Sequence, residues 1–488
     1  MTGDRTRRGL TQRLRKAVAH SFPAGSAAGQ WGRKIAVATE DALAAFATPA
    51  LMVWDGRQLA RAWWRGGPGI GKAAAGRTIV MLVVSQVHVD PRVRQEAQAL
   101  AAAGYEITIM WPELATDIGR PIDWGDGISF QRLPTRAGRF AYRFPGFLGT
   151  EMLAAAMAHR PFAFHGHDLT TAMVAMIAAR RTGAHAVCDF HEWFSEHVTW
   201  SNWTRSYVPL SRGRRHINKW LERRCLAEAS AVITVCNSIA EEMEHAFEGG
   251  QRRVHVVRNI PEANAEPSRA YRSLRDELCL SDDKFIVLYQ GGIGPSRALE
   301  PVIAALAQVP ACVLVIRGPS VADYAAHYRQ VATSAGVNPG QLVLLPAVPS
   351  TDVVAACRGA DAGLYTVADL CKSFRYALPN KIFEYMRADL PILTADFPEV
   401  RGLAVDTGVG LAFDPQCPDS IAAAISAMTD PVARSDMRRR LPAVLAALDA
   451  DHEWTKLVRI YDTLVRDGRR PTAAAARERM ADGARIVR

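Results

Sequence analysis

The sequence predicts an α/β protein with two similar Rossmann-like domains, each built on a parallel, doubly wound sheet, that face each other across a cleft. Apolar runs long enough for buried strands recur along the chain, with segments of helical length between them. Strands that are apolar throughout are buried on both faces, and alternating strands and helices favour parallel pairing. A polar stretch at 261–284 separates two such series, and 488 residues are too many for one hydrophobic core.

The first series begins with a continuous apolar run and repeats a strand–helix pattern. Its expected strands are 78–84, 105–110, 163–165, 186–190, 231–235 and 254–257, with helices at about 92–103 and 170–182. Gly104 follows the first helix, at the position where glycine is favoured because it adopts the left-handed conformation easily.

The second series has the same organisation. Its expected strands are 285–289, 312–316, 342–345, 362–365 and 391–395, and an amphipathic helix at 454–466 ends the folded part. The carboxyl ends of parallel strands meet at one edge of each sheet, so functional residues are expected there. The chain divides into a basic amphipathic N-terminal extension (1–76), a first, acceptor domain (77–262), a second, donor domain (263–450), a C-terminal helix (451–466) and a basic tail (467–488).

The net charge of +10 is concentrated near the ends of the chain. Residues 1–34 hold eight Lys or Arg and one acid, and Leu10, Leu14, Val18 and Phe22 recur among them every four residues. This pattern is typical of a basic helix that lies on an anionic membrane surface, with a nucleic-acid patch as the rival interpretation. No signal peptide is evident, and the apolar run at 43–54 is too short to span a bilayer.

The eight cysteines form no C-x-x-C pair, so neither a zinc site nor a disulfide framework is expected. Reduced cysteines suit a cytoplasmic protein. No G-x-G-x-x-G follows the strands that begin at Thr78 and Phe285, which argues against a dinucleotide enzyme.

The most informative stretch is 378–385, where Pro379 precedes a helix start that contains Asn380, Lys381 and, one turn later, Glu384. A helix N-terminus attracts phosphate through its unpaired backbone N–H groups, and a lysine adds positive charge. A glutamate there can accept hydrogen bonds from both hydroxyls of a ribose. Phosphate and ribose together indicate a nucleotide.

Two pairs of polar residues end neighbouring strands of the first series. His167 and Asp168 follow one strand, where an imidazole can hold a sugar hydroxyl or phosphate oxygen and a carboxylate can orient it. His165 is expected to face the opposite side of that strand and to be structural. His191 and Glu192 end the next strand and are a second candidate pair, on the acceptor side.

Four segments together resemble the GT-B fold glycosyltransferases of the family 4 kind, which assemble bacterial polysaccharides and glycolipids. They are 90–97 (DPRVRQEA), 164–169 (FHGHDL), 290–297 (QGGIGPSR) and 378–385 (LPNKIFEY), in the family's order. The resemblance covers roughly residues 77–466. It implies catalytic roles for His167 and Asp168, donor binding by Gly291, Gly292, Arg297, Asn380, Lys381 and Glu384, and acceptor-side roles for Asp90, Arg92, His191 and Glu192.

The chain departs from the family pattern at three positions. Many members have a second glutamate eight residues before the one at Glu384, commonly in contact with the transferred sugar, and Tyr376 stands there instead. The glycine loop has Gly292 in place of an arginine and Arg297 in place of a lysine. The diphosphate clamp is therefore expected to consist of Arg297 and Lys381.

The resemblance implies a retaining glycosyltransferase that uses a nucleotide-diphosphate sugar, with no cofactor and no metal ion. The expected partners are the nucleotide sugar, a glycan or lipid-linked acceptor and an anionic membrane surface at the inner face of the cell membrane, with no nucleic acid. A nucleotide-sugar epimerase of the same fold and a membrane-docked binding subunit without turnover are the alternatives. Aromatic residues at 193–207 beside the cations of 205–224 favour a lipid interface over inward packing, and inward packing over single-stranded nucleic acid.

Overall fold

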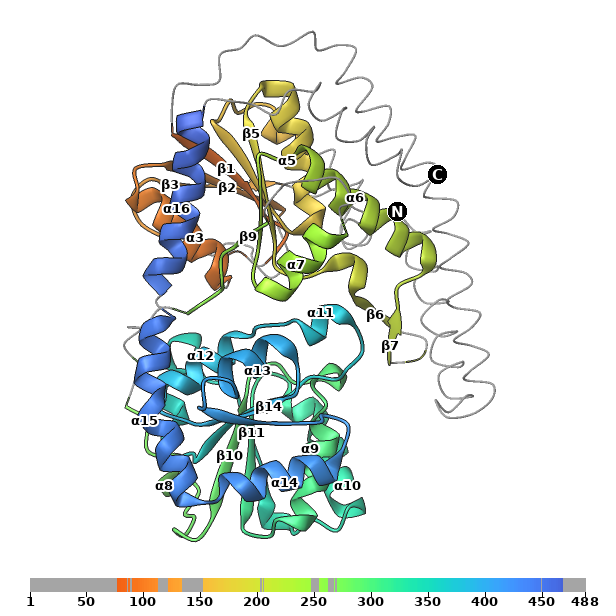
Figure 1. The fold of residues 1–488 in the computed structure, drawn as a ribbon, viewed down its shortest axis with the longest axis vertical. Helices are drawn as coiled ribbons and strands as arrows, with labels where there is room; N and C mark the ends of the chain where they lie inside the picture. The colour runs from red at the N-terminus through yellow and green to blue at the C-terminus, as the bar shows by residue number, and fades with distance from the viewer. Residues whose placement is uncertain are drawn as a thin grey trace, which may run out of the picture.

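The computed structural model describes residues 77–467 except for 86, 88–89, 113–121, 134–151, 202–203, 205, 247–253, 262–266, 268–269 and 449. The expected N-terminal basic helix and the basic tail beyond residue 467 lie outside these residues. The described chain forms two α/β bodies, one above the other in Figure 1.

The first body is built on a seven-stranded parallel sheet with the order β3-β2-β1-β4-β5-β8-β9. Its strands are β1 (Thr78–Leu82), β2 (Glu106–Pro112), β3 (Ile128–Leu133), β4 (Ala163–His167), β5 (His185–Phe190), β8 (Ala231–Thr234) and β9 (His255–Val256). The main helices are α3 (Pro91–Ala102), α5 (Asp168–Thr182), α6 (Arg212–Glu228) and α7 (Asn237–His245). A short helix η3 (Phe194–Glu196) leads into an antiparallel hairpin of β6 (Val198–Ser201) and β7 (Ser206–Pro209).

The second body has a six-stranded parallel sheet with the order β12-β11-β10-β13-β14-β15. Its strands are β10 (Phe285–Gln290), β11 (Cys312–Arg317), β12 (Leu342–Leu345), β13 (Ala362–Tyr365), β14 (Ile392–Ala395) and β15 (Gly410–Phe413). Its helices are α8 (Leu274–Glu277), α9 (Leu299–Ala305), α10 (Val321–Ser334), α11 (Lys372–Arg375), α12 (Asn380–Arg387), α13 (Pro398–Ala404), α14 (Pro418–Met428) and α15 (Pro431–Ala447). Single-turn helices are η4 (Pro295–Arg297), η5 (Leu306–Gln308), η6 (Pro339–Gln341), η7 (Ser350–Asp352) and η8 (Ala355–Cys357).

Both sheets are covered by a core on each face, as the apolar strand sequences predict. In β1, Val80 and Leu82 pack into one core of the first body, whereas Ile79 and Met81 pack into the other. The alternation follows from the two-residue period of a strand. The two-domain, parallel α/β prediction is therefore confirmed.

Three features of the fold differ from the sequence-based expectation. The edge strands β3 and β15 are not among the predicted strands, because edge segments mix polar and apolar residues or are short. The stretch 261–284 contains α8, whose Leu274 packs into a core of the second body, so this stretch is more than a linker.

The last helix, α16 (Ala450–Asp467), crosses back to the first body (Figure 1). It packs beside α3, and its residues Trp454, Leu457, Ile460 and Tyr461 complete the core on that face of the first sheet. The helix before it, α15, packs against α12 of the second body. The two bodies are thus joined both by the connection after β9 and by this return.

Candidate active site

The junction of β4 and α5 has no connecting loop. His167 is the last residue of the strand, and Asp168 begins the helix with φ 62°, a conformation that is strained for a residue with a side chain. A Cβ atom at Gly166 would lie 2.7 Å from the backbone of Ala172, so only glycine lets the helix approach the strand this closely. The sharp turn places His167 and Asp168 at the carboxyl edge of the sheet.

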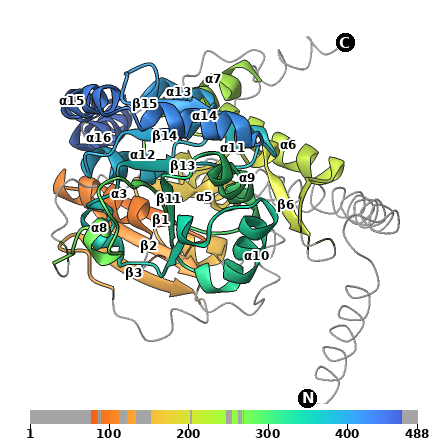
Figure 2. The same ribbon diagram turned by 90° about the horizontal axis from the view of Figure 1, so that it is seen from below.

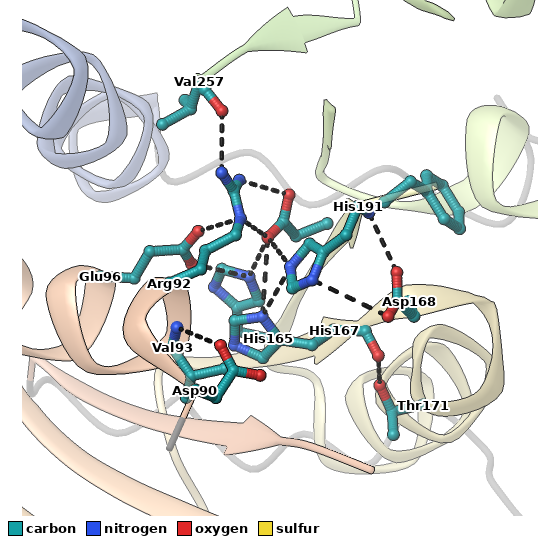
Figure 3. Close-up of polar contacts among 12 residues, drawn as sticks. Asp90, Arg92, Val93, Glu96, His165, His167, Asp168, Thr171, His191 and Val257 are labelled. Carbon is teal, nitrogen blue, oxygen red and sulfur yellow. Dashed lines mark hydrogen bonds and ion pairs between the residues drawn. The ribbon is translucent and has the colours of Figure 1, made fainter. Parts of the chain in front are cut away.

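Asp168 ties this edge to the end of the neighbouring strand. Its carboxylate accepts a hydrogen bond of 3.0 Å from the backbone N–H of His191, and its second oxygen lies 3.8 Å from the Nδ1 atom of that histidine. The first predicted pair, His167 and Asp168, therefore meets His191 of the second pair at one place, as the parallel pairing of β4 and β5 requires (Figure 3).

A buried carboxylate, Asp189, organises the residues behind this edge, and Figure 3 labels its neighbours Arg92, His167 and His191. Arg92 donates to both of its oxygens, at 3.0 and 2.9 Å, and the Nε2 atom of His191 lies 2.8 Å from Oδ2. The Nδ1 atom of His167 lies 3.5 Å from the same oxygen. Burial would raise the pKa of Asp189, but Arg92 and His191 outweigh it and hold that pKa well below its usual range.

Arg92 is expected from the sequence on the acceptor side, but its guanidinium lies in the core. Only 2% of the residue is exposed, and the third donated bond goes to the carbonyl oxygen of Val257 at 3.0 Å. Its Nε atom also lies 2.9 Å from Glu96, one turn further along α3. Arg92 thus supports the site from behind and does not reach into the cleft.

His165 shares a face with His167, contrary to the sequence-based expectation. Its ring stacks on that of His167 with centroids 4.4 Å apart and an interplanar angle of 13°. Residues two apart on a strand point to the same side, and the expectation of opposite sides was a misapplication of this period. Burial lowers the pKa of both histidines, so both are neutral near pH 7.

A cavity of about 160 Å³ opens in front of these residues, lined in part by Asp90, His167, Asp168, His191 and Phe194. Asp90 caps α3 by accepting from the backbone N–H of Val93 at 3.3 Å, and it also accepts from the Ser85 hydroxyl at 2.7 Å. Burial opposes the charge on His191, but Asp168 and Asp189 together raise its pKa to about 9. The cavity is therefore lined by a cationic imidazole and by carboxylates, which suits a ligand with many hydroxyl groups.

Glu192 points to a different part of the cleft. Its carboxylate, 55% exposed, lies 3.1 Å from the Nε2 atom of His197. Burial would raise its pKa, but His197, His191 and Arg297 of the second body together lower it. The effect of Arg297 shows that the two bodies approach each other here closely enough for their charges to interact.

The second body brings its predicted residues to the carboxyl end of β10. Gly291 follows this strand with φ 134°, and a Cβ atom there would lie 2.8 Å from the Nζ atom of Lys381. A Cβ atom at Gly292 would lie 3.7 Å from Arg297, which ends η4. Both predicted cations therefore border the glycine turn, although they come from segments more than 80 residues apart in the sequence.

Lys381 is held by an aromatic ring instead of an acid. Its Nζ atom donates to the Tyr289 hydroxyl at 3.1 Å and lies 4.1 Å from the ring centroid. Burial and the nearby charge of Arg297 lower its pKa to about 7, although Glu384 acts in the opposite direction. Within the described part of the chain, neither Lys381 nor Arg297 has a carboxylate at ion-pair distance, and Glu384 and Glu192 act on them from further away. Two adjacent cations without counter-ions form a site that is ready for an anion.

Asn380 and Glu384 lie on α12, the helix that carries Lys381. Asn380 is the first residue of the helix, after Pro379 at the N-cap. Glu384 lies one turn further on, where burial raises the pKa of its carboxyl. All six predicted donor residues thus lie on two segments, the turn after β10 and the start of α12.

The segment before α12 contacts the first body. Lys372 and the Tyr376 hydroxyl reach Glu242 of α7 at 2.9 and 2.8 Å, and the Tyr376 ring stacks on Trp193 at 6.2 Å. The Ser373 hydroxyl accepts from the backbone N–H of Trp193 at 3.2 Å. Tyr376, which replaces the family's first glutamate, is therefore part of the contact between the bodies.

Four side chains in the first body lie close enough to hold a metal ion: Glu96, His167, Asp189 and His191. Arg92, however, already places a positive charge 2.9 Å from Glu96 and from Asp189. Burial raises the pKa of Glu96 well above its usual range, which favours a protonated carboxyl and weakens it as a ligand. A divalent ion would have to displace the guanidinium.

The sequence analysis missed Asp189, Glu96 and Tyr461 as members of the site. Asp189 was detectable, because a carboxylate inside the apolar strand 186–190 needs a buried partner. Glu96 lies one turn after Arg92, a spacing that favours an ion pair. No sequence signal links Tyr461 to a histidine 296 residues earlier.

Residues 89–259 match the family model described as a glycosyl transferase 4-like domain. Sucrose-phosphate synthase from Thermosynechococcus elongatus is similar in structure, with a TM-score of 0.62, 18% identity, and coverage of 79% of this chain and 98% of that one. HepE from Anabaena in complex with UDP and glucose has a TM-score of 0.58 and 15% identity, and the match covers 80% of this chain and 98% of that one. WaaG, a glycosyltransferase involved in lipopolysaccharide biosynthesis, has a TM-score of 0.54 and 13% identity, and the match covers 79% of this chain and 99% of that one. No curated protein sequence matches significantly.

At these identities the structural likeness shows the fold alone, which is the GT-B fold of these glycosyltransferases. The match to the glycosyl transferase 4-like domain lies within the first body, at residues 89–259. The structural likeness, at these low identities, extends the fold assignment over both bodies.

We expect a nucleoside diphosphate to bind with uptake of a proton. Near pH 8, which is above the Lys381 pKa of about 7, the empty site holds this amine mostly neutral. A diphosphate beside it raises the pKa, so up to about one proton enters on binding. Isothermal titration calorimetry of UDP, GDP and ADP in buffers of different ionisation enthalpy measures this number.

Lys381→Arg is the control, because guanidinium stays charged with or without the ligand. Binding to this variant should involve less proton uptake than binding to the wild type. Equal uptake in both, or none in the wild type, would contradict the pKa assigned to Lys381.

Proposed function

We propose that the protein is a retaining glycosyltransferase that moves a sugar from a nucleotide-diphosphate sugar to a glycan or lipid-linked acceptor in cell-envelope polysaccharide or glycolipid synthesis. The observation that carries this is the pair of cations without counter-ions, Arg297 and Lys381, at the glycine turn of the second body. Across the cleft lies the polar cavity of the first body, bordered by His167 and Asp168.

The second body would bind the donor. Backbone groups of Gly291 and Gly292 and the first turn of α12 at Asn380 would approach the phosphates, and Glu384 would accept hydrogen bonds from the ribose. When the glycosidic bond breaks, negative charge develops on the leaving diphosphate. Arg297 and a protonated Lys381 would stabilise this charge, which is the largest contribution that such a site can make.

The first body would hold the sugar and the acceptor. The Nε2 atom of His167 is buried and has no hydrogen-bond partner among the described residues, so it is available for a hydroxyl of the transferred sugar. Asp168 orients the end of β5 through His191. Asp90, His191 and Glu192 would face the acceptor, while Arg92 acts only by holding Asp189 in place.

Retention is proposed to follow from attack on the same face of the sugar. A donor phosphate oxygen would take the proton of the acceptor hydroxyl as the new bond forms, so no protein nucleophile is required. Tyr376 stands where many family members have a glutamate, and its hydroxyl contacts Glu242 of the first body. This position therefore supplies no carboxylate to the sugar. HepE, similar in fold, has been crystallised in complex with UDP-glucose, which makes this donor the first to try.

A panel of nucleotide sugars tests this proposal, together with the variant Glu384→Ala. The variant should bind its nucleotide about ten- to a hundredfold more weakly, because two hydrogen bonds to a charged group are lost. Glu300→Ala, on helix α9 of the same body, is the control and should bind normally. Unchanged affinity of Glu384→Ala for every nucleotide that binds wild type would contradict the donor assignment.

The same panel separates the alternative functions. Transfer or slow hydrolysis of the donor supports a transferase, and His167→Ala should reduce it. Conversion of the donor into its epimer without an acceptor would instead indicate an epimerase. Tight binding with no turnover would indicate a binding subunit.

Metal independence is part of the proposal. Cationic side chains take the place that a divalent ion would have beside the diphosphate. Transfer should therefore persist in EDTA at the rate seen with added Mg²⁺ or Mn²⁺. Complete loss in EDTA, restored by either ion, would reverse this and would point to the histidine–carboxylate group of the first body.

We also propose that the protein works at the inner face of the cell membrane. Arg214, Arg215 and Arg223 on α6 are exposed, and Trp200 of the neighbouring hairpin is 38% exposed. Figure 2 shows α6 and β6 together at one edge of the molecule. Trp193, by contrast, packs into the core and does not belong to this surface. Of the helices described, none has the length and apolar character needed to cross a membrane.

Vesicles that contain anionic lipid should bind the full chain, and more weakly in high salt, because each cation near the surface contributes about 1 kcal/mol. Deletion of residues 1–34, or the double change Arg214→Glu and Arg223→Glu, should reduce this binding. Arg329→Glu with Arg358→Glu, two exposed cations of the second body, is the charge-matched control. Binding to single-stranded RNA but not to vesicles would assign the basic surface to nucleic acid.

A further inference from the structure

The helix α16 follows the second body in sequence but supplies a hydroxyl group to the histidines of the first. Tyr461 on this helix is fully buried, and its Oη atom lies 2.8 Å from the Nδ1 atom of His165. The two rings lie nearly parallel, with centroids 6.2 Å apart. The ring of His165 in turn stacks on His167, so a direct chain of contacts leads from α16 to the cavity.

The direction of the hydrogen bond determines the tautomer of His165. Among the described residues, the phenolic O–H of Tyr461 finds its acceptor in this one ring nitrogen. Nδ1 is therefore the acceptor, and the proton of the neutral imidazole lies on Nε2. Nε2 faces the carboxyl group of Glu96 at 3.6 Å, too far for a hydrogen bond, so among the described residues Tyr461 makes the one hydrogen bond to this ring.

We propose that Tyr461 is a positioning residue for His167: its hydroxyl fixes the tautomer and ring plane of His165, and the stacked His165 ring fixes the orientation of His167 toward the cavity. This inference rests on the proposed function, in which His167 contacts the transferred sugar. Tyr461 itself does not reach the cavity and touches no substrate.

The position of Tyr461 depends on both bodies, because α16 contacts the first body and follows directly on α15 of the second. Glu453, near the start of the helix, accepts from the backbone N–H of Arg258 at 3.0 Å and lies 3.4 Å from its guanidinium. Arg258 lies just after β9, where the chain leaves the first body. Since α16 is also the continuation of α15, a change in the relative placement of the bodies acts on the same helix that holds His165.

A neighbouring tyrosine provides a matched control. Tyr105 is also buried, and its hydroxyl donates to Asp462 of α16 at 2.9 Å. Its ring meets the edge of the Tyr461 ring at 5.6 Å. Tyr105→Phe therefore removes one buried hydroxyl that holds α16 in place, but it leaves the histidines untouched.

The decisive experiment compares Tyr461→Phe with Tyr105→Phe in the full chain labelled with ¹⁵N-histidine. In wild type, NMR should show His165 with its proton on Nε2. Tyr461→Phe should shift the His165 ring nitrogens toward a mixture of tautomers and move the signals of His167, whereas Tyr105→Phe should leave both unchanged. This comparison needs no substrate.

Kinetics provide the second measurement, with UDP-glucose as the probe. Tyr461→Phe should lower kcat about tenfold, the factor that corresponds to one hydrogen bond of ordinary strength, and leave the donor KM within about twofold. In a His165→Phe background, which keeps a ring but has no Nδ1, Tyr461→Phe should have no further effect. The NMR comparison does not depend on this cycle, so it tests the inference if His165→Phe fails to fold.

Unchanged His165 signals in Tyr461→Phe, or the same shifts in Tyr105→Phe, would overturn the inference. If His167→Ala loses activity but the His165 signals are unchanged in Tyr461→Phe, the inference is overturned and the catalytic assignment of His167 stands. Full turnover by His167→Ala would instead overturn the catalytic assignment on which the inference rests.

Discussion

The buried ion pair between Arg92 and Asp189 is the interaction on which the first body's site depends. It joins α3 to β5 through two hydrogen bonds, and a third bond from Arg92 reaches the chain after β9. Two charges that have left water are stable only while both are present, and removal of one partner commonly costs about 3 to 5 kcal/mol. Asp189 can therefore remain ionised in the core, where it keeps His167 in place, and its charge adds to that of Asp168 in raising the pKa of His191.

The two sides of the cleft show opposite electrostatic designs. In the first body, the charges are paired within the protein, and the histidines and carboxylates form a rigid network before any ligand arrives. In the second body, Arg297 and Lys381 lie close together without a counter-ion and repel each other, which is one cause of the lowered pKa of Lys381. A site of the first kind orients groups precisely, whereas one of the second kind gains from the binding of an anion.

Much of this arrangement could be predicted from sequence, because the signals are local. Apolar runs located the inner strands, and the residues at the ends of β4, β5 and β10 marked the functional edge of each sheet. The short segment 378–385 indicated both a helix start and its chemistry. Asp189 was detectable as a carboxylate inside an apolar strand, but its partners and the contribution of Tyr461 could not be predicted in the same way, since they depend on which elements become neighbours after folding. The face of His165 was predictable from the strand period and was assigned wrongly. The inward turn of Arg92 depends on a carboxylate 97 residues later.

The return of α16 to the first body means that this domain is not a continuous stretch of sequence. Trp454, Leu457, Ile460 and Tyr461 cover one face of its sheet, and the whole second body is encoded before them. During synthesis, the first body therefore cannot complete its core until the second has left the ribosome. A fragment that stops after β9 would expose the apolar surface that these side chains cover. The second body can therefore complete its core before the first body does, although the second body is synthesised later.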